Sequence, residues 1–190
     1  MTIYGRLIAA FWLVLFGYWA IAAFSAKRNI GARRWRTESS LRLSILVVVV
    51  IALRAPQLRH ALRSAQIVEA GSTLMGLSGA VLAALGVGLA IVARVHLGRN
   101  WGMPVSRKEN PELVTTGPYA FVRHPIYGGM LIAMIGSALG ESVFWILPLI
   151  LFGGYFIYSA RREEELMSEQ FPQQYPVYMA RTKMLLPLLL

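Results

Sequence analysis

The stretch IYGGMLIAMIGSALGESVFWILPLILFGGYFIYSA, Ile126–Ala160, decides the fold of this 190-residue chain. It is apolar almost throughout, and its main break is Gly140-Glu141-Ser142. One continuous helix over this stretch would be more than about 50 Å long at ~1.5 Å per residue, whereas the hydrocarbon core of a bilayer is about 30 Å thick. The pattern therefore predicts a hairpin of two membrane helices.

Further apolar blocks on the N-terminal side of the hairpin predict more spans. Leu7–Ala26 and Leu74–Val95 are each long enough to cross a bilayer. We interpret Leu7–Ala26 as a retained span, because no convincing small-residue cleavage site of a signal peptide follows it. The shorter block Leu43–Leu53 must extend to about Leu58 and carry Arg54 in order to span, which the snorkelling of a long cationic side chain permits at modest cost.

The composition supports a membrane protein. The chain is 56% hydrophobic and 15% charged, whereas soluble domains carry about a quarter charged residues. The net charge is +10, but the basic residues occupy the polar gaps between apolar blocks, so we interpret them as topology signals and predict no nucleic-acid partner. Because the sequence contains no cysteine, it excludes disulfides, thiol catalysis and Cys-ligated metal, and we predict no metal site.

The distribution of Lys and Arg discriminates between four spans and five. With five spans and the N-terminus outside, 15 of these residues lie inside and 4 outside, whereas four spans give 9 and 10. The positive-inside rule favours five spans. The sequence thus predicts an all-α integral membrane protein of about five transmembrane helices, in the inner membrane if the source is bacterial. Residues 1–62 hold an N-terminal pair of helices, and residues 70–190 hold a core of three helices, a connecting loop and a cytoplasmic tail.

Small residues in the span from Leu74 predict close helix packing. Gly76, Ala80, Ala84 and Gly88 recur at a strict four-residue spacing, which lets another helix approach closely. Packing within the bundle is the favoured interpretation, and a homodimer seam is the alternative.

The motif GPYAFVRHPIYGG, Gly117–Gly129, stands where the hairpin begins. Pro125 suits the first turn of a helix, and the positive end of that helix together with Arg123 forms a place for a carboxylate or phosphate. His124 and Tyr127 are three residues apart, hence on one helical face. The helix from about Ile126 to Leu139 would cover only about 20 Å, so its start is expected in a recess. The alternative is a basic and aromatic interface belt.

A second motif, SARREEELMSEQF, Ser159–Phe171, ends the hairpin. Three consecutive glutamates, Glu163–Glu165, follow Arg161 and Arg162 on the face predicted to be cytoplasmic. A solvated charge cluster is the simplest interpretation. The alternative is a carboxylate site that binds hydroxyls or an amino group, or balances a cationic cofactor.

Taken together, these motifs resemble the isoprenylcysteine carboxyl methyltransferase family and, more broadly, the membrane methyltransferases that include phospholipid methyltransferases. The resemblance extends over about Leu85–Pro187 and is carried by LGRNW (Leu97–Trp101), LVTTGPYAFVRHPIYGG (Leu113–Gly129) and EEELMSEQFPQQYPVYMARTKMLLP (Glu163–Pro187). It implies S-adenosylmethionine as the methyl donor, bound in a cytoplasmic pocket over the last hairpin, with lipid access from the side. The implied acceptor is a prenylcysteine carboxylate, with a phospholipid or another small lipophilic amine, thiol or acid as the alternative.

The resemblance also implies residue roles. The implied cofactor contacts are Pro104, Pro111, Glu112, Leu113, Val114, Tyr119, His124, Pro125, Ile126, Tyr127, Glu163 and Glu164. Where the family has its substrate-binding arginine this chain has Ser159, so Arg123, Arg161 and Arg162 are the candidates for positioning a substrate.

Two other functions are compatible with the sequence. Membrane sterol and enone reductases have a similar Arg-His…Tyr-x-Gly feature and use a nicotinamide cofactor. A non-catalytic membrane scaffold, whose basic loops face anionic lipid, would explain the charge asymmetry.

Overall fold

The computed structural model describes residues 2–23, 29–30, 44, 73–100, 107–108 and 112–185. Helices dominate these residues. The long helices are α1 (Ile3–Ala23), α4 (Thr73–Leu97), α5 (Pro125–Gly140) and α6 (Ile146–Gln170), and the shorter ones are η1 (Gly98–Asn100), η2 (Gly117–Ala120), η3 (Val143–Trp145) and α7 (Tyr175–Arg181). Two antiparallel strands of two residues each, β1 (Asn29–Ile30) and β2 (Arg107–Lys108), complete the described elements.

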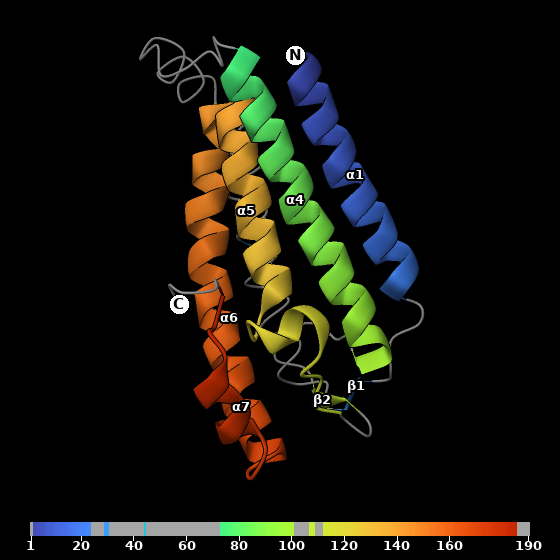
Figure 1. Ribbon diagram of the computed structural model, residues 1–190, viewed down its shortest axis with the longest axis vertical. Helices are drawn as coiled ribbons and strands as arrows, with labels where there is room; N and C mark the ends of the chain where they lie inside the picture. Colours follow the sequence, from blue (N-terminus) through green and yellow to red (C-terminus); the bar gives the residue numbers. More distant parts are fainter. Residues whose placement is uncertain are drawn as a thin grey trace.

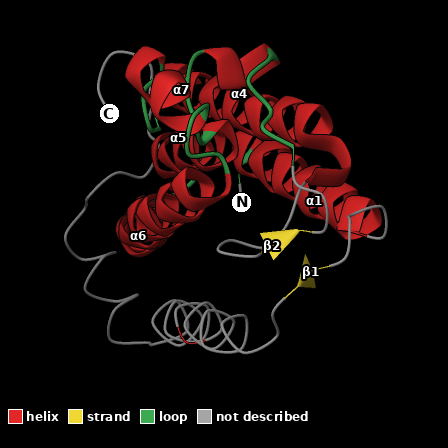
Figure 2. Cartoon of the chain, turned by 90° about the horizontal axis from the view of Figure 1, so that it is seen from below, coloured by secondary structure: helices red, strands yellow, loops and turns green. Residues whose placement is uncertain are grey.

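The four long helices run side by side in the order α1, α4, α5, α6 (Figure 1). Helix α6 extends beyond the ends of its neighbours at the bottom of this view, and α7 lies against that extension. Seen from below, the β1–β2 pair lies to one side of the bundle (Figure 2). Helices α4 and α5 therefore form the centre, with η2 and α7 at the end where the candidate site lies.

Three of the helical segments are long and apolar enough to cross a membrane, namely Ile3–Ala22, Thr73–Leu97 and Val143–Gln170, and Pro125–Gly140 is a shorter apolar helix. The expectation of an α-helical membrane protein agrees with these spans. The predicted span Leu43–Leu58 lies outside the described residues, so five spans, and the sidedness that follows from them, stay predictions.

The predicted pair of helices is confirmed, but α6 continues past the predicted end at Ala160 to Gln170, and α5 is shorter than the candidate membrane spans. Helix α5 ends at Gly140, the turn follows at Glu141, and η3 leads into α6. The Ser142 side chain accepts a hydrogen bond from the Phe144 amide at 3.3 Å, and Trp145 Nε1 donates to Glu141 Oε2 at 2.9 Å. The polar residues that interrupt the apolar stretch thus satisfy the backbone and side-chain groups of the turn.

Helices α4 and α5 meet backbone to backbone. A Cβ atom built on Gly86 would lie 2.5 Å from the carbonyl oxygen of Gly129, and one on Gly136 would lie 2.6 Å from that of Gly79. Ala83 and Ala133, both fully buried, lie within the same seam. No side chain fits between the two backbones at these positions, so glycine sets the distance between the helices.

Small residues of α4 do allow close helix packing, as predicted, but the residues that face α5 are not those of the predicted row. The α4 residues buried in the seam are Gly79, Ala83, Gly86, Ala90 and Ala93, with alternating steps of four and three. A row of strict four-residue steps winds around the helix instead of following one partner, because a turn contains about 3.6 residues. Accordingly, Gly76 packs against Tyr4 of α1, whereas a Cβ on Gly88 would have nothing within 4 Å.

Helix α1 is joined to this pair at its middle and near its C-terminal end. Trp12 Nε1 donates to Ser137 Oγ of α5 at 3.0 Å, and the Trp12 ring stacks on Trp145 with centroids 5.2 Å apart. Arg94, only 2% exposed, donates to the carbonyl oxygens of Ala22 at 2.8 Å and Gly98 at 2.7 Å. A single buried guanidinium thereby satisfies carbonyls at the C-terminal ends of two helices.

We predict opposite outcomes for alanine at two neighbouring glycines of α4. Gly86→Ala places a methyl group against the α5 backbone, and such overpacking costs about 1–3 kcal/mol, so the thermal midpoint in detergent should fall. Gly88→Ala adds the same atom in open space and should leave the midpoint unchanged or slightly raised. Equal midpoints for the two variants would contradict the assigned seam.

Candidate functional site

The boundary motif is held in place by the C-terminal tail. Val122 pairs with Lys183 in an isolated parallel bridge. The amide of Arg123 donates to the Lys183 carbonyl at 2.8 Å, and the amide of His124 donates to the Met184 carbonyl at 2.9 Å. The tail therefore supplies acceptors for backbone donors that directly precede the first turn of α5.

The 3₁₀-helix η2 is fixed against α4 and α7. Gly117 has φ +59°, and any Cβ there would collide with the His96 imidazole of α4, so glycine is required for both reasons. The Tyr178 hydroxyl of α7 donates to the Tyr119 carbonyl at 2.7 Å. Tyr119 is consequently buried, with 6% of its surface exposed.

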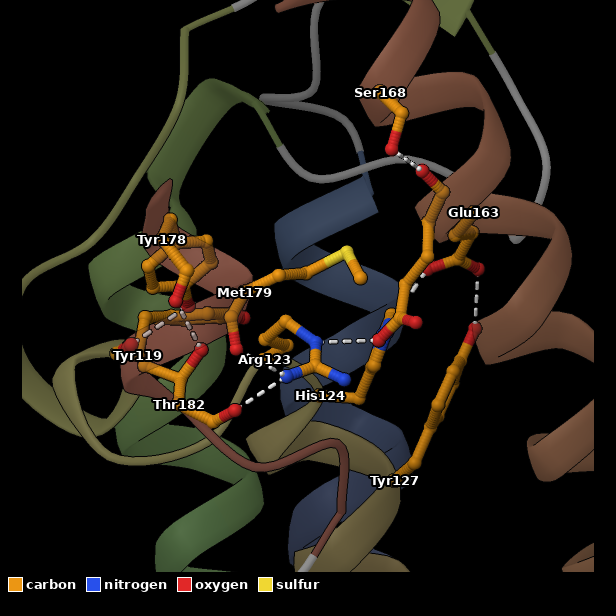
Figure 3. A network of polar contacts seen from close by, with 10 residues as sticks. Tyr119, Arg123, His124, Tyr127, Glu163, Ser168, Tyr178, Met179 and Thr182 are labelled. Carbon is orange, nitrogen blue, oxygen red and sulfur yellow. Dashed lines mark hydrogen bonds and ion pairs between the residues drawn. The ribbon is translucent and has the colours of Figure 1, made fainter. Parts of the chain in front are cut away.

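Four charged or ionisable residues meet between the boundary motif and α6, and we call Arg123, His124, Glu163 and Glu164 the charge cluster. Arg123 Nε donates to Glu164 Oε1 at 2.5 Å. His124 places Nδ1 3.5 Å from Glu163 Oε2 and Nε2 3.3 Å from Glu164 Oε1. Figure 3 shows His124 and Arg123 directed toward α6. The two motifs lie on the two arms of the α5–α6 hairpin, with Arg123 and Glu164 41 positions apart in sequence, and they form one site.

Tyr127 and the C-terminal tail complete the surroundings of the charge cluster. Tyr127, in the first turn of α5, donates its hydroxyl to Glu163 Oε1 at 2.6 Å (Figure 3). Arg123 also donates through its NH1 group to the Thr182 carbonyl at 2.5 Å and to the Met179 carbonyl at 3.3 Å. The Arg123 charge, which the sequence suggested as part of an anion pocket, is therefore engaged with Glu164 and the tail.

Burial and the two carboxylates act on His124 in opposite directions. Burial lowers the pKa of the imidazole, but the contacts with Glu163 and Glu164 outweigh it and raise the pKa above its ordinary value. The favourable interaction of the charged ring is therefore fully present below the ordinary histidine pKa of 6.5 and is lost as the pH rises through the raised pKa. With His124 protonated, the charge cluster contains two cations and two anions.

The surrounding phenols stay neutral. Burial raises the pKa of Tyr178 to about 12, against the opposing effect of Arg123, and burial raises the pKa of Tyr119 and that of Tyr175 further. These side chains can hydrogen-bond but cannot act as bases at physiological pH.

An aromatic column leads from the cluster into the space between α5 and α6. The rings of His124 and Tyr127 are nearly parallel, with centroids 5.6 Å apart, and those of Tyr127 and Phe156 are 4.7 Å apart. Phe152 continues the column at 5.9 Å from Phe156. The cluster thus opens toward an apolar environment on the hairpin side.

An open pocket of about 580 Å³ lies at the end of α4 and includes the segment before η2. Its described lining residues are His96, Leu97, Gly98, Asn100, Glu112, Leu113, Val114, Thr115 and Thr116. Asn100 Nδ2 donates to Glu112 Oε2 at 3.1 Å. The volume falls within the range of about 300–1,000 Å³ that is usual for small-molecule sites.

The structure groups most of the predicted cofactor contacts. His124, Tyr127, Glu163 and Glu164 are mutual neighbours, Pro125 and Ile126 are buried in the first turn of α5, Tyr119 lies in η2, and Glu112, Leu113 and Val114 line the pocket. Pro104 and Pro111 lie outside the described residues.

The predicted substrate-positioning arginines are placed less favourably. Arg162 pairs with Glu165 at 2.6 Å in an exposed pair, and Arg161 is exposed on α6. Ser159, one turn before Glu163, is fully buried. No described residues form a group of three His, Cys, Asp or Glu that could hold a metal ion.

Several residues that position the site were not predicted from the sequence. Asn100 and His96 lie in the pocket, and the tail contributes main-chain carbonyls from Met179 to Met184. Asn100 belongs to the LGRNW motif (Leu97–Trp101), so the sequence did contain a signal that could have identified it as a pocket residue. A carbonyl acceptor leaves no signature in the residue type, so the tail contacts could not be found.

Comparison with known protein families identifies the region that holds the candidate site. The model of the phospholipid methyltransferase family matches residues 74–174, more than half of the chain. That match contains the pocket segment, the boundary motif and the glutamates of the charge cluster.

Three relatives are similar over the same length of chain. The chain is 34% identical over 109 residues to the nickel-cobalt-cadmium resistance protein NccN of Alcaligenes xylosoxydans xylosoxydans (55% of this chain, 50% of the relative). It is 34% identical over 110 residues to the cobalt-zinc-cadmium resistance protein CzcN of Cupriavidus metallidurans (56% and 48%). It is 32% identical over 109 residues to the protein-S-isoprenylcysteine O-methyltransferase of Schizosaccharomyces pombe (55% and 46%). The chain thus spans about half the length of the relatives it matches.

We predict that Arg123 fastens the tail to the site. Arg123→Gln removes charge-assisted hydrogen bonds worth about 1.5–3 kcal/mol, so hydrogen exchange at the amides of His124 and Lys183 should accelerate at least about tenfold. Arg161→Gln, a matched change at an exposed position of α6, should leave both rates unchanged. Unaltered exchange in Arg123→Gln would show that the tail is held by its backbone bonds alone.

Proposed function

Because this chain belongs to the phospholipid methyltransferase family, we propose that it is a membrane methyltransferase that uses S-adenosylmethionine to methylate a lipophilic acceptor. The observation that carries the proposal is the meeting of His124 with Glu163 and Glu164 at 3.5 and 3.3 Å. His124 directly precedes α5 and the two glutamates lie in α6, so the antiparallel hairpin sets these residues side by side, and it is their ionisable side chains, gathered beside an otherwise apolar pair of helices, that suit a ligand.

The residues present fit such a donor chemically. Carboxylates of Glu163 and Glu164 suit hydroxyl and amino groups, and Tyr127 adds a hydroxyl beside them. In the pocket, Leu113 and Val114 suit the faces of a nucleobase, and Glu112 offers a carboxylate. The positive end of α5 suits a carboxylate. When bound, S-adenosylmethionine supplies a methyl group that its sulfonium has already activated.

The protein's own contribution is alignment and exclusion of water. Methyl transfer is an in-line displacement, so holding the reacting groups in one geometry supplies much of the acceleration. His124 and Tyr119 are 9% and 6% exposed, and the tail closes the site from outside the bundle. The proposed methyl transfer therefore requires few polar side chains, which agrees with a site that contains four charged or ionisable groups.

The contacts that the arginines make favour an acceptor without a carboxylate. Arg123 is engaged with Glu164, Arg162 with Glu165, and Arg161 is exposed. Ser159, buried beside the aromatic face of α6, brings no charge. An acceptor carboxylate would need a cation in this apolar region, whereas a neutral or amine-bearing lipid would not. We therefore propose an amine-bearing or neutral lipophilic acceptor, which reaches the site along the column of Tyr127 and Phe156. An amine acceptor first gives its ammonium proton to solvent, because only the free lone pair can take the methyl group.

Binding of S-adenosylhomocysteine to detergent-solubilised protein tests the donor site. We expect His124→Ala and Glu163→Gln each to weaken binding at least about tenfold, equivalent to roughly 1.4 kcal/mol. Glu165→Gln is the matched control, because Glu165 is exposed and pairs with Arg162 away from the cluster. NADPH should give no thermal stabilisation. Stabilisation by NADPH without binding of S-adenosylhomocysteine would replace the proposal with a reductase.

A transfer assay tests the acceptor class. With a labelled methyl donor, we expect incorporation into lipids with primary or secondary amine head groups and little into prenylcysteine analogues, because the nearby cations are already engaged. Preferential labelling of prenylcysteine analogues would show that Arg161 or Arg162 reorients toward the site, and Arg161→Gln and Arg162→Gln would then identify which one.

A further inference from the structure

His124 is enclosed by carboxylates on both of its ring nitrogens. Nδ1 faces Glu163 at 3.5 Å and Nε2 faces Glu164 at 3.3 Å, and only 9% of the residue is exposed. A neutral imidazole has one nitrogen without a proton, which would direct its lone pair at a carboxylate oxygen. The imidazolium has a proton on each nitrogen and its positive charge is attracted to both carboxylates, although Nε2 forms no hydrogen bond. The geometry therefore selects the charged ring.

The other groups that face the ring define its charge balance. Helix α6 contributes Glu163 and Glu164, the preceding residue Arg123 is already bonded to Glu164, and Tyr127 of α5 is bonded to Glu163. Among the described residues, the further ionisable groups that interact with these carboxylates are the phenols of Tyr119 on η2 and of Tyr175 and Tyr178 on α7, which stay neutral. Arg123 cancels one carboxylate, so the second is balanced by the imidazolium.

Resting on the proposed function, we propose that His124 is an exchangeable cation that determines selectivity for a positively charged ligand. A cationic group that binds beside Glu163 and Glu164 takes over the balancing charge, and the imidazolium then gives up one proton to solvent. Charge is conserved, because one cation enters the cluster as one proton leaves. The ligand group is an ammonium or a sulfonium, both of which the methyl donor has.

The exchange has a consequence that a fixed positive residue would not produce. Binding of the cationic ligand is linked to proton release, so its affinity rises with pH by up to about tenfold per pH unit while His124 titrates. The affinity of a neutral ligand does not rise with pH in this way, because the carboxylates still need the positive charge of the imidazolium when such a ligand is bound. The cluster thus discriminates by charge as well as by shape.

Calorimetric titration at neutral pH tests the exchange. Binding heats measured in buffers of different ionisation enthalpy give the number of protons released, and we expect a value approaching one for S-adenosylmethionine and none for 5′-methylthioadenosine, which has no charge. Release with S-adenosylhomocysteine as well supports exchange for the ammonium, and release with S-adenosylmethionine alone supports exchange for the sulfonium. Binding of S-adenosylmethionine with no proton release and no pH dependence would overturn the inference and leave the proposed function standing.

A variant and a second measurement assign the proton. His124→Gln keeps a hydrogen-bonding side chain but cannot titrate, so its residual binding should release no proton and should not vary with pH. If this variant does not bind, NMR titration of the wild-type protein decides, because the chain has three histidines and the variant identifies the His124 signal by its absence. We expect the pKa of His124 to fall on addition of S-adenosylmethionine. An unchanged pKa, or proton release that persists in His124→Gln, would overturn the assignment, whereas failure of every ligand to bind the wild-type protein would refute the donor site itself.

Discussion

The backbone contact between α4 and α5 is the constraint on which the rest of the structure depends. Glycines on both helices bring main chain against main chain, as at Gly86 and Gly129, and this leaves α5 no freedom to shift or rotate without collision. The first turn of α5 holds Tyr127 and is preceded directly by His124. A short helix fixed in this way therefore aims its polar end at α6 with little conformational cost on ligand binding.

The charge cluster is stable in an apolar setting because its members satisfy one another. Arg123 spans from Glu164 to the Thr182 carbonyl, and His124 contacts both glutamates. Removing one partner would leave an unbalanced charge near the bilayer, which costs far more than the pair contributes. Such a cluster supports the fold and, under the proposed function, also binds the ligand, so changes in it would affect folding and binding together.

Sequence reasoning reached the elements whose signals are local. The hairpin followed from the length of an apolar stretch and its polar break at Glu141, and the start of α5 from Pro125. The proximity of His124 and Glu163 followed from two motifs expected on one membrane face. The register of the α4 seam did not follow, because a spacing of four does not reveal which face meets a partner. The engagement of Arg123 was missed for a similar reason, since its acceptors at Thr182 and Met179 are carbonyls that every residue has.

The pairing of Val122 with Lys183 has a consequence for biosynthesis. A ribosome makes the membrane helices first and the strand that closes the boundary motif afterwards, so a nascent chain already inserted in the bilayer still lacks the acceptors for the amides of Arg123 and His124. The boundary motif is therefore closed in a late, post-insertion step. Quality-control proteases that survey membrane proteins would encounter the form in which this end of the bundle is not yet closed.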